Sequence, residues 1–184
     1  MSRVVVFLAE GFEEIEAMVP IDLLRRGGVD VTLSGVHGRM ITGAHGIRIE
    51  ADEELVNFEN YQDYDAVVLP GGMPGSKNLS DSREVNKLIV SMFNADKIIG
   101  AICAAPAVVL GKLGILRGKT AVCYPGAEVY APPECVFADH PVVTDGNLIT
   151  AQGAGYAAEF GLALLKALEG DDAAVEVGKA TLFT

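Results

Sequence analysis

Short runs of apolar, mostly β-branched residues alternate along this chain with segments of helical periodicity, and no other feature limits its folding as strongly. Residues 4–9 and 65–69 are typical of strands that are buried on both faces. Residues 14–26 carry apolar side chains at helical spacing and are followed by two glycines. Because parallel strands need helical crossovers, we expect an α/β fold with a doubly wound, mostly parallel sheet and helices on both faces.

Residues 97–110 predict a strand, a sharp turn and a helix, with Cys103 at the corner. Pro106 falls where the first helical turn would begin, a position that needs no backbone N–H. Ala101 and Ala105 supply the small neighbours that a nucleophile elbow requires. Such a turn would hold the sulfur above a helix N-terminus, which favours a thiolate. The alternative is an inert buried cysteine, and this stretch alone does not separate the two.

Other segments predict the remaining elements of the sheet and its helices. The glycine-rich segment 70–75 lacks the G-x-G-x-x-G pattern, and we expect no helix directly after it, so a dinucleotide loop is not favoured. Further predictions are a strand at 29–34, a hairpin arm at 47–50, a capping box at 81–84 that opens a helix, a strand at 120–123, a hairpin on Asp145-Gly146, and helices at 156–168 and 172–179.

Length, charge and cysteine content exclude several classes of protein. With 184 residues, half of them apolar, residues 1–184 are expected to form a single domain. A net charge of −11 argues against binding to nucleic acid or to an anionic membrane. No window has the length of a signal peptide or a membrane span, so we expect a cytoplasmic protein. The three cysteines and three histidines show no metal-ligand spacing, so neither a metal site nor a cofactor is predicted.

Three polar or reactive segments follow predicted strands directly. They are residues 10–14, Gly71-Gly72 and Cys103. In doubly wound folds the carboxyl ends of parallel strands meet at one edge of the sheet, where ligands bind. This convergence favours a functional role for Cys103 over an inert one.

Three motifs then resemble those of the ThiJ/PfpI superfamily, in the subgroup of the parkinsonism-associated protein deglycase. They are the segments at 11–17, 67–72 and 101–106, and the resemblance continues through residues 152–155 and the closing helix at 159–168. It implies a flavodoxin-like α/β sandwich, a homodimer, no cofactor, and a cysteine on a nucleophile elbow with a glutamate against it.

The resemblance also implies the roles of individual residues. Cys103 corresponds to the nucleophile, Glu16 to the carboxyl group that touches the sulfur, and Gly72 and Ala104 to the backbone donors. A carboxyl group enclosed by apolar residues has a raised pKa, so Glu16 could stay protonated and donate to a thiolate. The adjacent Glu14 is expected to be mostly a solvated charge on the helix, although it remains a candidate for the substrate pocket.

The chain departs from the family pattern at three positions near these motifs. Tyr124 stands where much of the subgroup has a histidine before proline, His45 where an arginine is expected, and Ala154 where a proline is expected. A phenol can orient a carbonyl but is a poor base at neutral pH. We therefore include Tyr124 and His45, with Glu14, in the expected substrate pocket.

By analogy with the family, the chain is expected to convert a small dicarbonyl, methylglyoxal or glyoxal, to a hydroxy acid without glutathione. This is the glyoxalase III reaction, and the related deglycase activity would remove glycation adducts from proteins. The alternative is an oxidative-stress sensor or redox-linked chaperone in which Cys103 becomes a sulfinic acid. An intracellular protease and a thiazole monophosphate biosynthesis protein are the least favoured. Peptidase-like members of the family have a histidine directly after the nucleophile, where this chain has Ala104, and the thiazole function is not supported because no phosphate loop or basic cluster is present.

Overall fold

The computed structural model describes residues 1–55 and 61–183, and its centre is a sheet of mostly parallel strands. The strands of this sheet are β1 (Arg3–Leu8), β2 (Asp30–Gly35), β5 (Glu53–Glu54), β6 (Ala66–Leu69), β7 (Ile98–Ile102), β10 (Val142–Asp145) and β11 (Leu148–Ala151). Within the described residues seven strands join in the order β10-β11-β7-β6-β1-β2-β5, and β10 alone is antiparallel to its neighbour. The predicted doubly wound α/β fold is confirmed.

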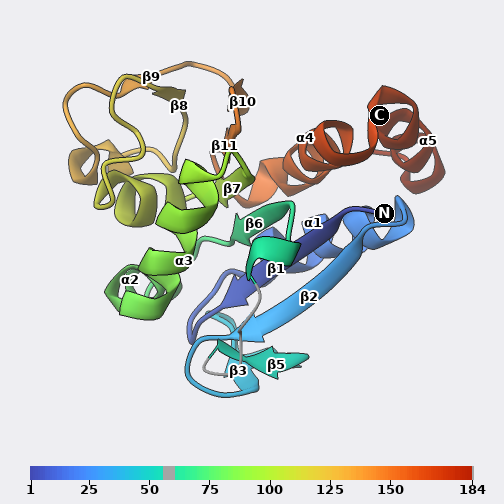
Figure 1. The fold of residues 1–184 in the computed structure, drawn as a ribbon, viewed down its shortest axis with the longest axis horizontal. Coiled ribbons are helices and arrows are strands. Elements are labelled where there is room, and N and C mark those ends of the chain that lie inside the picture. The colour runs from blue at the N-terminus through green and yellow to red at the C-terminus, as the bar shows by residue number, and fades with distance from the viewer. Residues whose placement is uncertain (56–60, 184) are drawn as a thin grey trace.

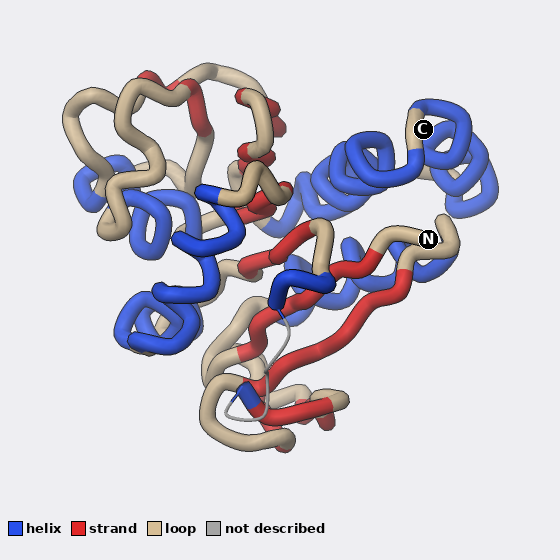
Figure 2. The backbone as a smooth tube through the Cα atoms, in the orientation of Figure 1, coloured by secondary structure: helices blue, strands red, loops and turns tan. Residues whose placement is uncertain are grey.

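Helices cover both faces of this sheet, as Figures 1 and 2 show. They are α1 (Glu14–Arg26), α2 (Gly75–Asp81), α3 (Arg83–Asn94), α4 (Ala157–Glu169) and α5 (Asp171–Thr181), together with a π-helix at Pro106–Gly111. Helices α1, α4 and α5 pack on one face, whereas α2, α3 and the π-helix pack on the other. Burial of both faces explains why the strands are apolar throughout.

Strand β1 shows how one sequence supplies two cores. Val4, Val6 and Leu8 belong to the core under α1 and α4, while Val5 and Phe7 belong to the core under α2 and α3. Side chains alternate between the two faces of a strand, so a run of apolar residues fills both cores at once.

In the described part of the chain, two short strand pairs lie outside the central sheet. Strands β3 (Met40–Thr42) and β4 (Arg48–Glu50) form the predicted hairpin, and their connecting loop carries His45. Strands β8 (Thr120–Ala121) and β9 (Val136–Phe137) form a separate parallel pair. The strand predicted at 120–123 is therefore shorter than expected, because the chain turns away after Ala121.

One prediction about the segment after β6 is wrong. Helix α2 begins at Gly75, the last residue of the glycine-rich segment 70–75, whereas no helix was expected there. Its glycine and polar residues give no helical periodicity, and only Leu79 among its apolar side chains enters the core. The helix predicted to open at residues 81–84 is confirmed as α3. Its cap is the Ser82 side chain, which accepts the Val85 N–H at 3.3 Å.

Across the described residues, we find no helix that is both long and apolar enough to cross a membrane.

Candidate active site

Cys103 occupies the corner between β7 and the π-helix. Its backbone adopts a left-handed conformation with φ +64°, which costs a non-glycine residue about 1 to 2 kcal/mol. Two hydrogen bonds fix this conformation: the Cys103 N–H donates to Ala151 O at 2.9 Å, and the Tyr124 N–H donates to Cys103 O at 2.7 Å. Pro106 is the first residue of the π-helix, as the sequence predicted. The strained turn therefore presents the sulfur at the carboxyl edge of the sheet.

The loop after β6 brings backbone N–H groups to the same edge. Gly72 has φ +86°, and a Cβ on it would collide with the backbone N of Glu13, so only glycine fits this approach. The backbone N–H groups of Gly72 and Ala104 both donate to the Cys103 sulfur. The structure thus brings these two N–H groups to the Cys103 sulfur.

Glu16 reaches the sulfur from the first turn of α1. Its side chain is 1% exposed, and its Oε2 accepts the Gly71 N–H at 3.0 Å. The carboxyl group also accepts a hydrogen bond from the Cys103 thiol and one from the Ala154 N–H. Segments that follow β1, β6, β7 and β11 thus meet at one carboxyl group, because these strands run parallel and end at one edge.

This enclosure changes the acidity of Glu16. Burial raises the pKa of Glu16 from 4.5 to about 7, the charge of Glu13 acts in the same direction, and hydrogen bonds from Cys103, Gly71 and Ala154 partly offset both. The predicted raised pKa is confirmed in direction. A carboxyl group with a pKa near 7 can both donate and accept a proton at neutral pH, as a general acid–base catalyst must.

The acidity of Cys103 differs from the prediction. Burial, the charge of Glu16 and the hydrogen bond to Glu16 raise the pKa of the thiol from 9.0 to about 12, against the lowering effect of the Gly72 and Ala104 N–H groups. A helix N-terminus alone therefore does not produce a thiolate here. Protonation of Glu16 removes the repelling charge and supplies an O–H donor to the sulfur, so the two groups titrate as a coupled pair.

Glu14 is not the solvated charge that the sequence suggested. It is 6% exposed, and its Oε1 accepts the backbone N–H groups of His45 at 2.8 Å and Ile47 at 3.3 Å. Burial acts to raise the pKa of Glu14, but these bonds and the bond to the His45 ring outweigh it and lower the pKa. The carboxylate of Glu14 therefore fastens the β3–β4 loop to α1 instead of facing solvent.

His45 lies in front of two carboxylates, those of Glu13, the N-cap residue of α1, and Glu14, the first residue of the helix. Its Nδ1 is 3.0 Å from Glu14 Oε2 and 3.4 Å from Glu13 Oε2. The hydrogen bond to Glu14, followed by the charges of Glu13 and Glu14, raises the pKa of His45. The three side chains offer ligand atoms within 4.8 Å of one another. Because the imidazole already pairs with both carboxylates, we interpret them as an ion-paired cluster and assign no metal to it.

Tyr124 stands at the mouth of the site. The residue is 55% exposed, and its Cδ2 would be 3.5 Å from a Cβ on Gly153, which precedes the Ala154 donor. The backbone of Tyr124 is bonded to that of Cys103, so the exposed side chain starts next to the nucleophile and can meet a substrate.

The other two thiols lie elsewhere in the fold. Burial, followed by the charge of Glu128, raises the pKa of Cys123 to about 12, and burial raises that of Cys135. Neither has Glu16 among the groups that shift its pKa.

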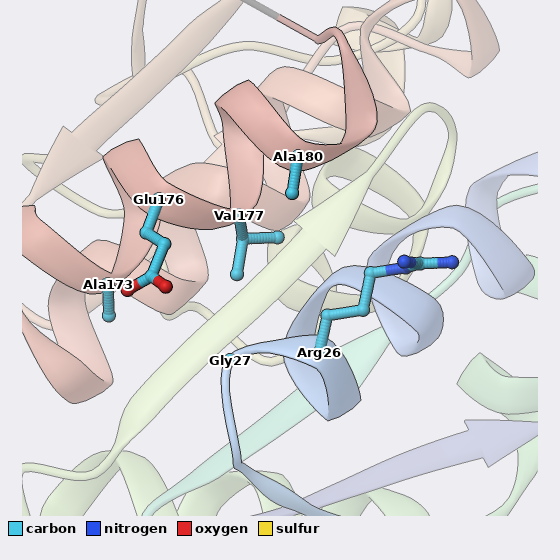
Figure 3. A pocket seen from close by; sticks show the side chains of 6 residues that line it. All are labelled: Arg26, Gly27, Ala173, Glu176, Val177 and Ala180. Carbon is cyan, nitrogen blue, oxygen red and sulfur yellow. The ribbon is translucent and has the colours of Figure 1, made fainter.

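A hollow of about 320 Å³ is separate from this chemistry, and Figure 3 shows the residues that line it. It lies between the end of α1, at Arg26 and Gly27, and α5, which contributes Glu176 and Val177. Because α1 spans 13 residues, this hollow is about 15 to 20 Å along the helix from Glu16. It contains neither a thiol nor an imidazole.

Two contributors to the site were missed in the sequence. The Gly71 and Ala154 N–H groups bind Glu16, but backbone donors leave no residue-type signature. The glycine-rich composition of residues 71–72 and 153–155 was the available signal, because closely approaching backbone needs small residues.

This fold and this site define the class of protein: an α/β protein with a cysteine on a nucleophile elbow that faces a buried carboxyl group. A profile of the DJ-1/PfpI family matches residues 2–167. The chain belongs to the DJ-1/PfpI family.

Known proteins of this family are similar over nearly the whole chain. The Parkinson disease protein 7 homolog of Danio rerio is 36% identical, with 99% of this chain and 97% of that protein covered. Protein DJ-1 homolog B of Arabidopsis thaliana is also 36% identical, but this chain spans only 40% of its length. The structure of oxidized DJ-1 from Toxoplasma gondii has a TM-score of 0.93 and 32% identity, with 99% and 98% of the two chains covered.

Proposed function

We propose that this chain is a glutathione-independent glyoxalase of the glyoxalase III type that acts on methylglyoxal or glyoxal. The DJ-1/PfpI family includes cysteine-dependent enzymes, which supports catalysis by Cys103 in general. The observation that carries the specific proposal is the pairing of Cys103 with a carboxyl group whose pKa is about 7.

The pair supplies both functions that the reaction needs. The Cys103 thiolate adds to the aldehyde carbon while protonated Glu16 gives its proton to the aldehyde oxygen, which forms a hemithioacetal and leaves Glu16 as a carboxylate. The N–H groups of Gly72 and Ala104 lie beside the sulfur. Glu16 then takes the proton from that carbon and returns it to the neighbouring carbon through an enediol, which leaves a thioester. Water hydrolyses the thioester, so methylglyoxal plus water gives lactate and the free thiol.

Lactate production by purified protein tests this proposal. We expect saturable loss of methylglyoxal with one lactate formed for each molecule consumed. Cys103→Ala and Glu16→Leu are expected to abolish turnover, whereas the matched Cys123→Ala variant retains it. Equal turnover in Cys103→Ala would contradict the proposal.

Oxidation of Cys103 is the second candidate function, and one observation favours it. Glu16, once protonated, can donate a hydrogen bond to a sulfinic acid as well as to a thiolate. The similar Toxoplasma gondii structure is described as oxidized. A sensor or redox-linked chaperone would show stoichiometric modification of Cys103 by peroxide and no catalytic loss of dicarbonyl, so the same assay distinguishes the two functions.

A further inference from the structure

His45 and Glu13 form a chain of charges that leads from the solvent to Glu16. The His45 side chain is 69% exposed, so it exchanges protons freely with water. Its backbone N–H and that of Ile47 are nevertheless bound to Glu14, which keeps the loop against α1. The ring Nδ1 consequently stays within 3.4 Å of Glu13 Oε2.

Glu13 stands between this imidazole and the buried acid. Glu13 is the N-cap residue of α1 and Glu16 lies in the first turn of the same helix, where the charge of Glu13 acts on the Glu16 carboxyl group. Both hold the same peptide segment, because the Glu13 N–H donates to Gly71 O at 3.0 Å and the Gly71 N–H donates to Glu16 Oε2 at 3.0 Å. The Glu13 side chain is only 16% exposed, so water screens its charge incompletely.

We propose that His45 and Glu13 are positioning residues that control whether Glu16 carries its proton. This regulation rests on the proposed function, because it sets the pH range in which the Glu16 acid can serve Cys103. Neither residue needs to touch substrate.

The direction of the effect follows from the charges. While His45 is protonated, its imidazolium compensates the charge of Glu13, and Glu16 releases its proton more readily. As the pH rises and His45 becomes neutral, the uncompensated Glu13 carboxylate favours retention of the proton on Glu16. Glu16 therefore stays protonated to a higher pH than it would beside a permanent cation.

Other charged groups around the pair are few among the described residues. Glu14 faces His45 from α1, and Glu10 faces the hairpin from the β1–α1 loop, where it accepts the Thr42 N–H at 3.0 Å. Arg48 begins β4 and is the basic residue that follows His45 most closely in the chain. Cys103 is the titratable group bonded to Glu16 itself.

The test follows the ¹³Cδ chemical shift of Glu16 against pH at low ionic strength. Glu13→Gln should lower the apparent pKa of Glu16 by about 0.5 to 1 unit, because removal of a nearby partly buried charge has that effect. His45→Gln should raise this pKa, because a cation is lost, but only by about 0.3 units, because that cation is exposed to water. His45→Arg should lower it, and both shifts caused by the His45 variants should shrink in 1 M salt.

A matched control and an independent readout keep the proposal falsifiable. Glu159→Gln removes an exposed acid of α4 and should leave the Glu16 titration unchanged. Shifts of equal sign in His45→Gln and His45→Arg, or no shift in folded Glu13→Gln, would overturn the proposal. If Glu13→Gln does not fold, the two exposed His45 variants decide alone. Because the readout is not turnover, shifts without dicarbonyl loss would overturn only the proposed enzyme function.

Discussion

Glu16 holds its proton more tightly in the folded chain than in the unfolded one, and stability must therefore depend on pH. Its pKa is about 7 when folded and 4.5 as an ordinary glutamate. The stability that it contributes is complete below pH 4.5 and is lost as the pH rises through 7, because folding then requires a buried carboxylate. A difference of this size corresponds to about 3 kcal/mol.

We predict that Glu16→Gln removes this dependence. Relative to Glu16→Gln, the wild-type free energy of unfolding should fall by about 3 kcal/mol between pH 4.5 and pH 8. Urea unfolding at both pH values measures the difference, and Glu176→Gln, an exposed site on α5, controls for the change in net charge. If the free energy of unfolding changed with pH in the same way for the wild type and for Glu16→Gln, the pKa of Glu16 would not be raised in the folded chain.

At the scale of elements, the loop between β6 and α2 determines how closely Glu16 and Cys103 approach. A Cβ on Gly71 would collide with Glu16 Oε2 and lie 2.5 Å from Cys103 Cβ. The opposite case is Gly155, where a Cβ would meet no atom within 4 Å. These two glycines therefore form a matched pair for substitution.

We predict that Gly71→Ala separates the acid from the sulfur, whereas Gly155→Ala does not. Overpacking of this kind costs about 1 to 3 kcal/mol, and displacement of about 1 Å lowers turnover by about 100-fold. The measurements are urea unfolding and dicarbonyl loss for both variants. Similar unfolding free energies and similar turnover in Gly71→Ala and Gly155→Ala would mean that the loop adjusts without moving Glu16 away from Cys103.

The sequence predicted these elements unevenly, and the reasons are physical. Strands β1, β6 and β7 were predicted because burial on both faces demands apolar runs, and α3 because Ser82 and a one-sided apolar stripe are local signals. Helix α2 was missed, since its seven residues are stabilised by tertiary contacts rather than by periodicity.

Within the site, the sequence predicted where the functional residues lie better than it predicted their burial and their pKa values. The corner at Cys103 followed from its small neighbours and Pro106, and its positive φ agrees. The burial of Glu14 could not be predicted, because it depends on backbone N–H groups of a hairpin more than 30 residues away. The raised pKa of Cys103 has the same origin, since it comes from burial in the folded chain and from a charge on another element.

At the scale of the whole molecule, an exposed apolar patch formed by Ile15 of α1 and Ile47, the residue before β4, favours self-association. Ile15 is 51% exposed. Ile47 lies close to it, because the Ile47 N–H donates to the side chain of Glu14, the residue before Ile15. We propose that two copies of the chain bury this patch as a homodimer.

We predict a dimer of the 19.3 kDa chain at micromolar concentration by light scattering. Ile15→Lys should give a monomer, because a charged side chain would be buried without a partner. Val175→Lys is the control, since Val175 is equally exposed at 51% but lies on α5. A wild-type monomer, or loss of the dimer in both variants, would contradict this interface.

The last prediction concerns peptide cleavage, which this site is not equipped to perform. Expulsion of an amine from a tetrahedral intermediate requires a general acid that protonates the leaving nitrogen. The residue directly after the nucleophile is Ala104, and its contribution is a backbone N–H that donates to the sulfur. Glu16 is bonded to the sulfur, to Gly71 and to Ala154, and His45 is paired with carboxylates of α1.

An aldehyde makes a smaller demand, because it is more electrophilic than an amide and no amine has to leave. We therefore predict that the protein consumes methylglyoxal while casein remains intact under the same conditions. Electrophoresis of casein after prolonged incubation measures this, with Cys103→Ala as the control for contaminating proteases. Casein cleavage that vanishes in Cys103→Ala would require a proton donor for the leaving amine, and Tyr124, beside the nucleophile at the mouth of the site, would be the first residue to test.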